Sequence, residues 1–580
     1  MTEARVWAPN AERSVELVVG DRRIPLATTD GGWWAGADGV LEHGTDYAFS
    51  LDGGDARPDP RSPWQPDGPH GRSRWVDHAR FEWHDQGWHP PAWPSAVVYE
   101  LHVGTFTPKG TFDSAIERLD DLASLGISHI ELMPVAEFPG TRGWGYDGVD
   151  LYAPEHAYGS PDGLKRFIDA AHERGLAVLL DVVYNHFGPD GNYLMQFGPY
   201  LTDRYHTLWG DAVNLDGPGS DEVRRFLIDN ALLWLRDYHF DGLRLDAIHA
   251  LIDRSAVHFL EQLSTEVDQL EADLGRSLVL VAESDLNDPR VVRPRDEHGY
   301  GMDAQWSDDF RHALHVSLTG EQDGIHGDFS GLEDLCTALR DVFVYAGRRS
   351  TYRRRHHGRD AGDLPRSRFV GFLQNHDQVG NRAKGERSSH LLGPDALKVA
   401  AALVVLGPQV PLLFNGEEWA ASTPFLYFTD HHEELGQAVR EGRRKEFEAH
   451  GWPEDEVPDP QAPETFQRSK LVWDERDGDV HAEILAWHRR LIGLRRELPG
   501  LAAGPAPDVD CDVDAGWVTV RRSGTLLAAN LGDREVAVEI GSDTGWKIEA
   551  GSSDAVSLTN GRLVLPPMSA TLLLESPPGA

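Results

Sequence analysis

The sequence predicts an α/β fold, a (β/α)8 TIM barrel flanked by an N-terminal and a C-terminal β-sandwich. Through the middle of the chain, short apolar runs alternate with amphipathic helical patterns, which indicates a parallel sheet whose strands are joined by helices. There are eight such runs, the number that closes this barrel. Short alternating runs without helical patterns occupy both ends of the chain. We place the three regions at residues 1–88, 89–497 and 498–580.

The N-terminal region, from Arg5 to about Trp83, is predicted to be a small β-sandwich. It contains short alternating runs such as Val15–Val19, which are broken by Asp-Gly and Gly-Gly turns. This spacing of strands and turns is typical of sandwich folds. The Pro- and Trp-rich segment His89–Pro94 follows and marks a boundary.

The barrel region opens with its clearest β-α unit. The first strand is followed by a helical pattern whose apolar stripe runs from Ile116 to Leu125 and ends at Gly126. A second helix, at about 161–175, connects the second and third strands. The predicted strands are Val97–Phe106, His129–Val135, Ala177–Val183, Asp241–Leu245, Leu278–Ala282, Asp303–Trp306, Phe369–Leu373 and Val410–Phe414.

The charged stretch from Asp430 to about Pro463 predicts an extra helix and a loop. The short runs Trp517–Arg521, Leu526–Asn530 and Arg562–Leu565 then predict the C-terminal sandwich. The basic run Arg353–His357 is expected to be a solvated surface loop.

Composition narrows the class of protein. The formal net charge of -39 argues against binding to nucleic acid or to anionic lipid. The only two cysteines, Cys336 and Cys511, lack metal-ligand spacing and are expected to be reduced thiols. We find neither a signal-peptide pattern nor an apolar stretch long enough to span a membrane. We therefore expect a cytoplasmic monomer or homodimer with no membrane or nucleic-acid partner.

Polar side chains gather where four of the predicted strands end. The segments are Asp181–His186, Gly242–His249, the strand end at Glu283, and Asn375–Gln378. Because the ends of neighbouring strands converge on one mouth of a barrel, these segments should share a pocket. That pocket would hold three carboxylates, two histidines and an arginine.

Arg244 and Asp246 share one face of their strand, because side chains alternate along a strand. The arginine should lower the pKa of Asp246, and an ionised carboxylate at a strand end can act as a nucleophile. Taken alone, the pair is better explained as a structural ion pair. Like charges and partial burial should raise the pKa of Glu283 enough for it to hold a proton near neutrality.

One attacking carboxylate and one protonated carboxyl are what cleavage of a glycosidic bond requires. A metal site is the competing interpretation of such a cluster. The sequence contains no HExxH pair or comparable ligand pair on one helix, so we predict no metal and no cofactor. Asn185 stands where some amylases bind calcium, but no aspartate-rich loop accompanies it.

The four segments, in this order, resemble the sequence motifs of the α-amylase superfamily of glycoside hydrolases, over about 97–495. The resemblance implies that Asp246 is the nucleophile, Glu283 the general acid/base and Asp377 the group that stabilises the oxocarbenium-like transition state. It also implies retention of anomeric configuration through a covalent glycosyl-enzyme. Three further roles follow from it, with Arg244 positioning the nucleophile, and His186 and His376 binding hydroxyls of the reacting sugar.

The segments after strands two, six, seven and eight are similar to a narrower group within this superfamily. That group hydrolyses the α-1,4 bond next to the terminal trehalose unit of a maltooligosyl chain. The similarity makes Tyr146 a stacking platform, with core packing as its alternative. It assigns the substrate cleft, or direct support of the cleft, to His249, Asp308, Asp309, His312, Gln378 and Asn381. Aromatic faces for sugar rings would come from Trp144, Trp306, Trp419 and Tyr427.

Two other functions remain open. An α-1,4-glucan branching enzyme would share the fold and the three acids but would transfer the glucan instead of hydrolysing it. A non-catalytic glucan-binding scaffold would share the fold, although a binding protein has no need of all three acids. The expected partner in each case is an α-glucan, and the hydrolase interpretation specifies maltooligosyltrehalose.

Overall fold

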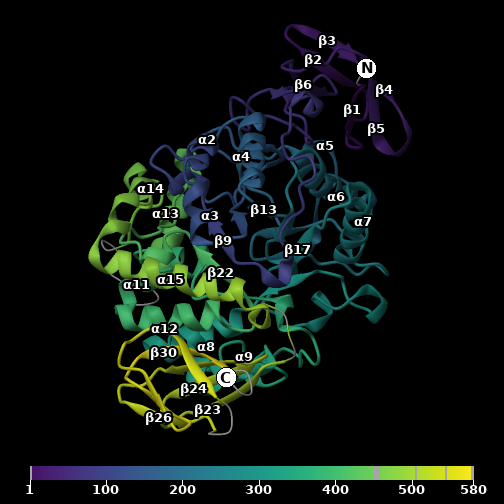
Figure 1. Cartoon of the computed structure of the whole chain (residues 1–580). Helices are drawn as coiled ribbons and strands as arrows, with labels where there is room; N and C mark the ends of the chain where they lie inside the picture. The colour runs from purple at the N-terminus through teal and green to yellow at the C-terminus, as the bar shows by residue number, and fades with distance from the viewer. Residues whose placement is uncertain (1–2, 449–456, 503, 505, 542–544, 576–580) are drawn as a thin grey trace.

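The centre of the molecule is a closed, parallel, eight-stranded barrel, and the predicted fold class is confirmed. The computed structural model describes residues 3–448, 457–502, 504, 506–541 and 545–575. Helices surround the barrel, and the two terminal regions lie at opposite ends of the molecule (Figure 1). In barrel order the strands are β10 (His129–Leu132), β13 (Ala177–Val182), β16 (Gly242–Leu245), β17 (Val279–Ala282), β18 (Ala304–Trp306), β21 (Phe369–Gly371), β22 (Val410–Phe414) and β9 (Val98–Leu101).

An apolar plug fills the inside of the barrel below its mouth. Val98, Leu179, Val281 and Phe372 belong to one buried cluster there, together with the ring of Trp306. Inward-facing side chains from neighbouring strands interdigitate in layers, so the barrel is a packed core without a channel. The plug gives the polar groups at the mouth a dry floor.

The first barrel strand is shorter than predicted. It ends at Leu101, and Val103–Phe106 form the single helical turn α1, whose residues are all buried. A short apolar run does not by itself distinguish a buried strand from a buried helical turn. The predicted helix that ends at Gly126 is divided into α2 (Phe112–Ile116) and α3 (Leu119–Leu125). Gly126 ends α3 with a φ of 101°, where its N–H bonds to carbonyls of the last turn.

The remaining helices lie outside the barrel, and α13 provides the extra helix that the charged stretch predicts. Its loop runs partly through residues 449–456, which lie outside the described residues. None of the helices within the described ranges is both long enough and apolar enough to cross a bilayer. The helices are α4 (Pro161–Glu173), α5 (Leu194–Phe197), α6 (Ser220–Asp237), α7 (Phe259–Leu274), α8 (Asp308–Thr319), α9 (Leu332–Asp341), α10 (His376–Gly380), α11 (Ser388–Leu391), α12 (Pro394–Val405), α13 (Glu433–Glu448), α14 (Pro463–Arg468) and α15 (Asp479–Glu497).

The N-terminal region consists of two antiparallel sheets, ordered β1-β5-β4 and β3-β2-β6-β7, with β8 paired to β6. Arg61 ties it to the barrel through an ion pair of 2.8 Å with Asp229 of α6. Its strands are β1 (Ala4–Trp7), β2 (Val15–Val19), β3 (Arg22–Pro25), β4 (Ala27–Thr28), β5 (Trp33–Gly36), β6 (Asp46–Leu51), β7 (Ala56–Arg57) and β8 (Ser73–Arg74).

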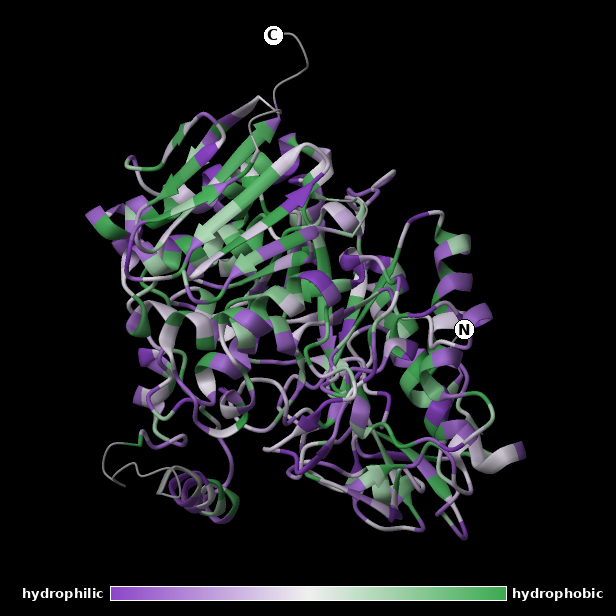
Figure 2. Cartoon of the chain, turned by 90° about the horizontal axis from the view of Figure 1, so that it is seen from below, coloured by the Kyte–Doolittle hydropathy of each residue, from purple (hydrophilic) through white to green (hydrophobic). Residues whose placement is uncertain are grey.

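The C-terminal region also has two antiparallel sheets, ordered β23-β24-β25-β30-β27 and β26-β29-β28. Their strands are largely hydrophobic (Figure 2), and the larger sheet packs on α12 and α9. The strands are β23 (Asp508–Asp512), β24 (Trp517–Arg522), β25 (Thr525–Asn530), β26 (Val536–Glu539), β27 (Trp546–Gly551), β28 (Ser557–Thr559), β29 (Arg562–Leu565) and β30 (Ser569–Glu575).

Small hairpins extend the loops at the mouth of the barrel. The hairpin after β13 matters most for the site, because its tip reaches over the mouth. These elements are β11 (Ala136–Glu137), β12 (Asp150–Pro154), β14 (Leu201–Thr207), β15 (Gly210–Val213), β19 (Arg349–Ser350) and β20 (Arg355–His356).

Candidate active site

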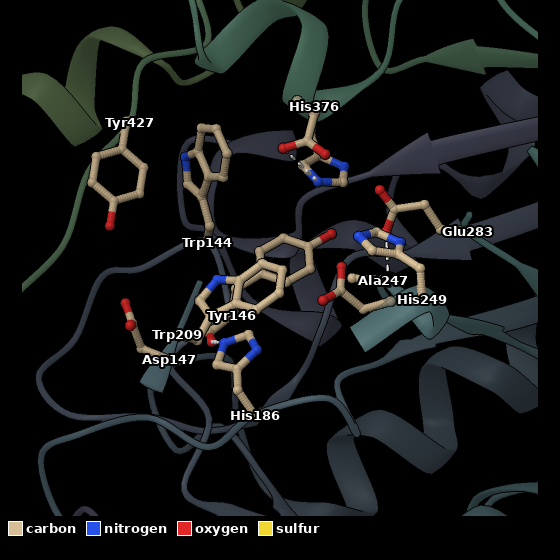
Figure 3. Close-up of a pocket in the computed structure, with 12 residues that line it drawn as sticks. Trp144, Tyr146, Asp147, His186, Trp209, Ala247, His249, Glu283, His376 and Tyr427 are labelled. Carbon is tan, nitrogen blue, oxygen red and sulfur yellow. Dashed lines mark hydrogen bonds and ion pairs between the residues drawn. The ribbon is translucent and has the colours of Figure 1, made fainter. Parts of the chain in front are cut away.

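A pocket of about 290 Å³ opens at the mouth of the barrel, where the carboxyl ends of the strands converge. We call it the aromatic pocket, because aromatic rings form much of its wall (Figure 3). Its lining consists of Trp144, Tyr146, Asp147, His186, Trp209, Asp246, Ala247, His249, Glu283, His376, Asp377 and Tyr427.

A second pocket of about 190 Å³, the acidic pocket, adjoins the first. Glu283 and Asp377 line both pockets, whereas Asp246 lines only the aromatic one. The acidic pocket is lined by Glu283, Asp285, Asn287, Trp306, Asp308, Asp309, His312, Ile325, Arg353, Asn375, Asp377 and Gln378. The structure therefore brings most of the predicted site residues to one mouth, on two sides of a shared pair of acids.

Arg244 lies beneath the pockets and contacts three carboxylates. Its Nη1 donates to Asp181 at 2.7 Å and to Asp246 at 3.0 Å, and its Nη2 lies 2.8 Å from Glu283. The guanidinium is fully buried and stacks 4.1 Å above the ring of Trp306. Parallel pairing of β13 with β16 sets Asp181 directly beside Arg244. Arg244 lines neither pocket, so it acts on the acids from below.

Asp246 is held by two donors, Asn185 at 2.9 Å and Arg244 at 3.0 Å. Burial raises the pKa of its carboxyl, while the Arg244 guanidinium opposes that shift. Arg244 thus lowers the pKa of Asp246, as the sequence predicts, but burial raises it by more, so the net shift is upward. The two donors nevertheless bind the ionised form of the carboxyl.

Glu283 accepts the backbone N–H of Ala247 at 2.7 Å. Ala247 adopts a φ of 38°, a left-handed conformation that is strained for a non-glycine residue and that aims this N–H. Burial raises the pKa of Glu283, and the nearby Asp246 carboxylate raises it further. The net upward direction agrees with the expectation that Glu283 retains a proton.

Asp377 is the most exposed of the three acids, with 37% of its side chain accessible. Asn381 donates to it at 3.1 Å and lines neither pocket, so Asn381 supports the acid from outside. His376 lies on the inner side, with Nε2 3.6 Å from Asp377 and Nδ1 in contact with Glu100 of β9. Burial alone would lower the pKa of His376, but Asp377 and Glu100 raise it to about 9.

Two rings in the aromatic pocket are fixed by polar contacts. The Tyr146 hydroxyl donates to Asp181 at 2.6 Å, and the Tyr146 ring stacks on His376. His186 has both ring nitrogens 2.9 Å from protein oxygens, those of Asn185 and Tyr146. The predicted contact of His186 with sugar hydroxyls would require it to exchange one of these partners.

Trp209 was missed by the sequence reasoning. It lies at the tip of the hairpin formed by β14 and β15, is 46% exposed, and stacks on His186 with 5.0 Å between ring centroids. No alternating apolar pattern marks this hairpin, because β14 contains mostly polar residues and none of its residues is buried. Only the aromatic residue at its tip could have given a signal.

Asp308 and Asp309 differ in what they face, although they are neighbours at the start of α8. The Asp309 carboxylate accepts from Asn287 at 2.7 Å and from two backbone N–H groups, and burial raises its pKa to about 6. Burial also raises the pKa of Asp308 well above its usual range, with Glu283 adding to the shift. A protonated Asp308 would be a hydrogen-bond donor to the pocket.

The other residues predicted to contact the substrate are divided between the two pockets. His312 and Gln378 line the acidic pocket, and burial lowers the pKa of His312, which keeps its ring neutral. His249 is exposed and lines the aromatic pocket. Of the four aromatic faces expected for sugars, Trp144 and Tyr427 line the aromatic pocket, whereas Trp306 is 1% exposed and lines the acidic pocket.

Two interpretations of the sequence need correction. Trp419 is 1% exposed and donates to Glu475 at 3.1 Å, outside both pockets. The basic run is solvated only at its centre. Arg353 lines the acidic pocket through an ion pair of 2.8 Å with Asp285, and His357 is buried against the backbone of the same residue.

Two clusters among the described residues have the spacing of metal ligands, and neither includes the three acids. In one, Glu321 is held by two hydrogen bonds of 3.0 Å from Arg382. In the other, Glu155 accepts the backbone N–H groups of Phe138 and Ala157, and Glu137 accepts the backbone N–H and the ring Nδ1–H of His156. Protein donors thus already occupy these oxygens.

Comparisons with known proteins agree with this geometry. A model of the alpha-amylase catalytic domain matches residues 75–205, and a domain of unknown function, DUF3459, matches residues 499–572. A malto-oligosyltrehalose trehalohydrolase of Arthrobacter ramosus is 53% identical, over 92% of this chain and 93% of that protein. A 1,4-alpha-glucan branching enzyme of Shewanella baltica is 30% identical, over 71% of this chain and 59% of that protein.

A crystal structure of a Salmonella typhimurium protein named as a candidate alpha amylase superposes with a TM-score of 0.91. It is 40% identical, and the match covers 99% of this chain and 97% of that one. The sequence motifs, the closed barrel, the clustered acids and these similarities agree with one another. The chain belongs to the malto-oligosyltrehalose trehalohydrolase family, within the α-amylase superfamily of glycoside hydrolases.

Proposed function

We propose that this protein hydrolyses the α-1,4 bond between a maltooligosyl chain and its terminal trehalose, releasing trehalose with retention of anomeric configuration. The observation that carries the proposal is the division of the cleft. Glu283 and Asp377 line both pockets, whereas Asp246 faces only the aromatic one. A general acid has to reach the leaving group and a nucleophile has to reach the opposite face of the reacting sugar, so this division orients the substrate.

In the first step, a carboxylate oxygen of Asp246 attacks the anomeric carbon while Glu283 donates its proton to the glycosidic oxygen. Trehalose leaves, and the maltooligosyl chain stays bound to Asp246 as an ester. In the second step Glu283 takes a proton from a water molecule whose oxygen attacks the anomeric carbon. The ester bond to Asp246 breaks, which releases the chain and restores both carboxyls. One guanidinium contacts both carboxyls, at 3.0 and 2.8 Å, which supports the short separation that a retaining mechanism requires.

The transition state carries positive charge on the sugar ring, and Asp377 supplies a nearby negative charge. His376, charged through its contacts with Glu100 and Asp377, would donate to a hydroxyl of the same ring. Arg244 holds the acids in position from beneath the pockets. These are positioning and electrostatic roles, which contribute most when the groups are fixed in place before the substrate binds.

The aromatic pocket suits the maltooligosyl side, because sugar rings stack on aromatic faces such as Trp209 and Tyr427. The acidic pocket suits the trehalose side, since Asp308, Asn287 and Arg353 offer both donors and acceptors to hydroxyls. The acceptors and donors on that side outnumber apolar faces, which fits a short, hydroxyl-rich leaving group better than a long glucan.

A direct test is to incubate the purified protein with maltooligosyltrehalose and, as a matched control, with the plain maltooligosaccharide of equal length. We expect trehalose from the first substrate, much slower turnover of the second, and the α-anomer as the first-formed reducing end. Formation of branched glucan from amylose, without trehalose release, would establish the branching alternative. Binding without turnover of either substrate would establish the scaffold alternative.

A further inference from the structure

The only two cysteines of the chain, 336 and 511 in the sequence, meet in space. Cys336 lies on α9 of the barrel region, and Cys511 lies on β23 of the C-terminal region. These two elements pack against each other, and Cys511 packs against the buried cluster that contains Cys336. Both residues are reduced in the structure.

The two thiols differ in accessibility. Cys336 is 1% exposed, in the buried cluster that continues into the barrel region, whereas Cys511 is only partly buried against that cluster. On β23, Val509 and Cys511 face inward while the three aspartates between and beside them are exposed. β23 is the edge strand of its sheet, and α9 packs against both β23 and its neighbour β24.

Burial raises the pKa of the Cys336 thiol, and the neighbouring Cys511 raises it further. Cys336 is therefore a poor nucleophile in the folded protein. The partly exposed Cys511 is the thiol that a dissolved reagent can reach first.

We propose that Cys336 and Cys511 form a site of reversible covalent modification, an intramolecular disulfide that ties the C-terminal sandwich to the barrel. The proposal does not depend on the proposed catalytic function. Its basis is the placement of both cysteines at one interface, with one thiol accessible and the other in contact with it.

The oxidant is a small-molecule disulfide such as oxidised glutathione. The thiolate of Cys511 attacks a sulfur of the reagent, its S–S bond breaks, and one glutathione leaves as a thiol. The sulfur of Cys336 then attacks Cys511 in the mixed disulfide, and the second glutathione leaves. Two electrons and two protons pass from the protein to the reagent, so the exchange balances.

The disulfide would enclose a long part of the chain. The segment between Cys336 and Cys511 contains β21, β22, α15 and the predicted catalytic Asp377. A cross-link across a long loop stabilises chiefly by restricting the unfolded chain. Since neither cysteine lines either pocket, oxidation should leave the pockets unchanged.

The test uses the full-length folded protein, incubated with oxidised glutathione and then analysed by intact mass and by peptide mapping. We expect a loss of the mass of two hydrogen atoms, a linked pair of peptides containing both cysteines, and a melting temperature higher by on the order of 5 °C. A reducing agent should reverse all three. Cys511→Ser and Cys336→Ala are the matched controls, and neither should show the rise in melting temperature.

A stable glutathione adduct on Cys511 without closure would overturn the proposal, as would two thiols that stay free in the folded protein. If the disulfide forms but the melting temperature does not rise, the inference that it ties the C-terminal sandwich to the barrel is wrong. The comparison of oxidised with reduced wild-type protein remains informative even if Cys336→Ala fails to fold, because it needs no substitution.

Discussion

The two pockets of the cleft share two acids but are built from different chemistry. The aromatic pocket has rings on its wall that are fixed by contacts to one another, such as Tyr146 on His376 and Trp209 on His186. The acidic pocket has few rings and many hydrogen-bonding groups, including Asp308 with a pKa raised by burial. A neutral sugar can be bound in either way, through ring faces or through hydroxyls, and the cleft uses one way on each side of the acids.

The groups that the two pockets share and the groups that distinguish them also come from different parts of the fold. Of the shared acids, Glu283 directly follows β17 and Asp377 lies in the first turn of α10. The distinguishing groups stand on loops, with Trp209 on one hairpin and Arg353 beside another. Rigid strands are suited to hold reacting groups, and loops are suited to vary the substrate that those groups meet. Substitutions should therefore separate effects on chemistry from effects on one side of the substrate.

The largest effect is expected for Asp246→Asn, which removes the nucleophile while Asn keeps the shape of the side chain. The kcat should fall on the order of 10⁴-fold, measured as trehalose release. The melting temperature should stay near the wild-type value, because Arg244 keeps its ion pairs with Asp181 and Glu283. Activity within tenfold of wild type would show that Asp246 is only a structural partner of Arg244.

Glu283→Gln should also cost several orders of magnitude on maltooligosyltrehalose, because the leaving oxygen loses its proton donor. The same variant should lose far less on an aryl glycoside whose leaving group needs no proton. Asp246→Asn is the matched control, since it should be inactive on both substrates. Equal losses of Glu283→Gln on the two substrates would contradict the assignment of acid and nucleophile.

Glu100→Gln tests a contact below both pockets. Wild-type His376 has its pKa raised to about 9, so its charge persists through neutral pH and is lost only as the pH rises through that value. Removal of the Glu100 charge should lower this pKa and move the alkaline limb of kcat against pH to lower pH. We expect a loss in kcat of roughly tenfold at neutral pH. An unchanged profile would mean that His376 works without charge.

Trp209→Ala and Arg353→Ala form a pair that addresses the two sides of the cleft. Trp209→Ala should raise KM about fivefold for long maltooligosyl chains and less for short ones, because loss of a stacking face is worth about 1 kcal/mol. Arg353→Ala should weaken inhibition by free trehalose and leave the dependence on chain length unchanged. Opposite results for the two variants would reverse the orientation of the substrate.

The smallest effect is expected outside both pockets, for Glu417→Gln at the end of β22. Burial raises the pKa of Glu417 to about 8. Its neutral form is favoured in the folded state, so its contribution to stability is complete below the ordinary pKa and is lost as the pH rises through about 8. The wild-type melting temperature should fall between pH 6 and 9 more steeply than that of the variant, as measured by scanning calorimetry. Activity at pH 6 should be the same for both.

The fold could be predicted because each barrel strand is a short apolar run that ends in a polar residue. The three acids were also visible in the sequence, since Asp246 and Glu283 each come directly after such a run and Asp377 follows the end of another by four residues. Polar side chains within the apolar runs were harder to recognise as part of the site. Glu100 lies between buried residues of β9, and only the closed barrel shows that it faces His376.

Loop residues were the hardest to predict, because their position depends on the whole path of the chain. Arg353 and Arg354 are adjacent and identical, yet one lines the acidic pocket and the other is exposed. The net pKa shift of Asp246 also depends on burial, which no local sequence pattern reports. Composition and periodicity indicate where helices and strands lie and where the strands end. How deeply a side chain is buried can be seen only in the three-dimensional structure.

The apolar plug under Arg244 has an electrical consequence. Trp306 and the layers below it leave the guanidinium and its carboxylates without water on the barrel side, so the pocket opening is their principal path to a high-dielectric medium. A sugar that fills the pockets displaces that water. The field between Arg244 and the acids then becomes stronger at the moment when the substrate is in place. Because the floor of the cleft is already packed, a bound substrate would complete the exclusion of water from Arg244 and its carboxylates.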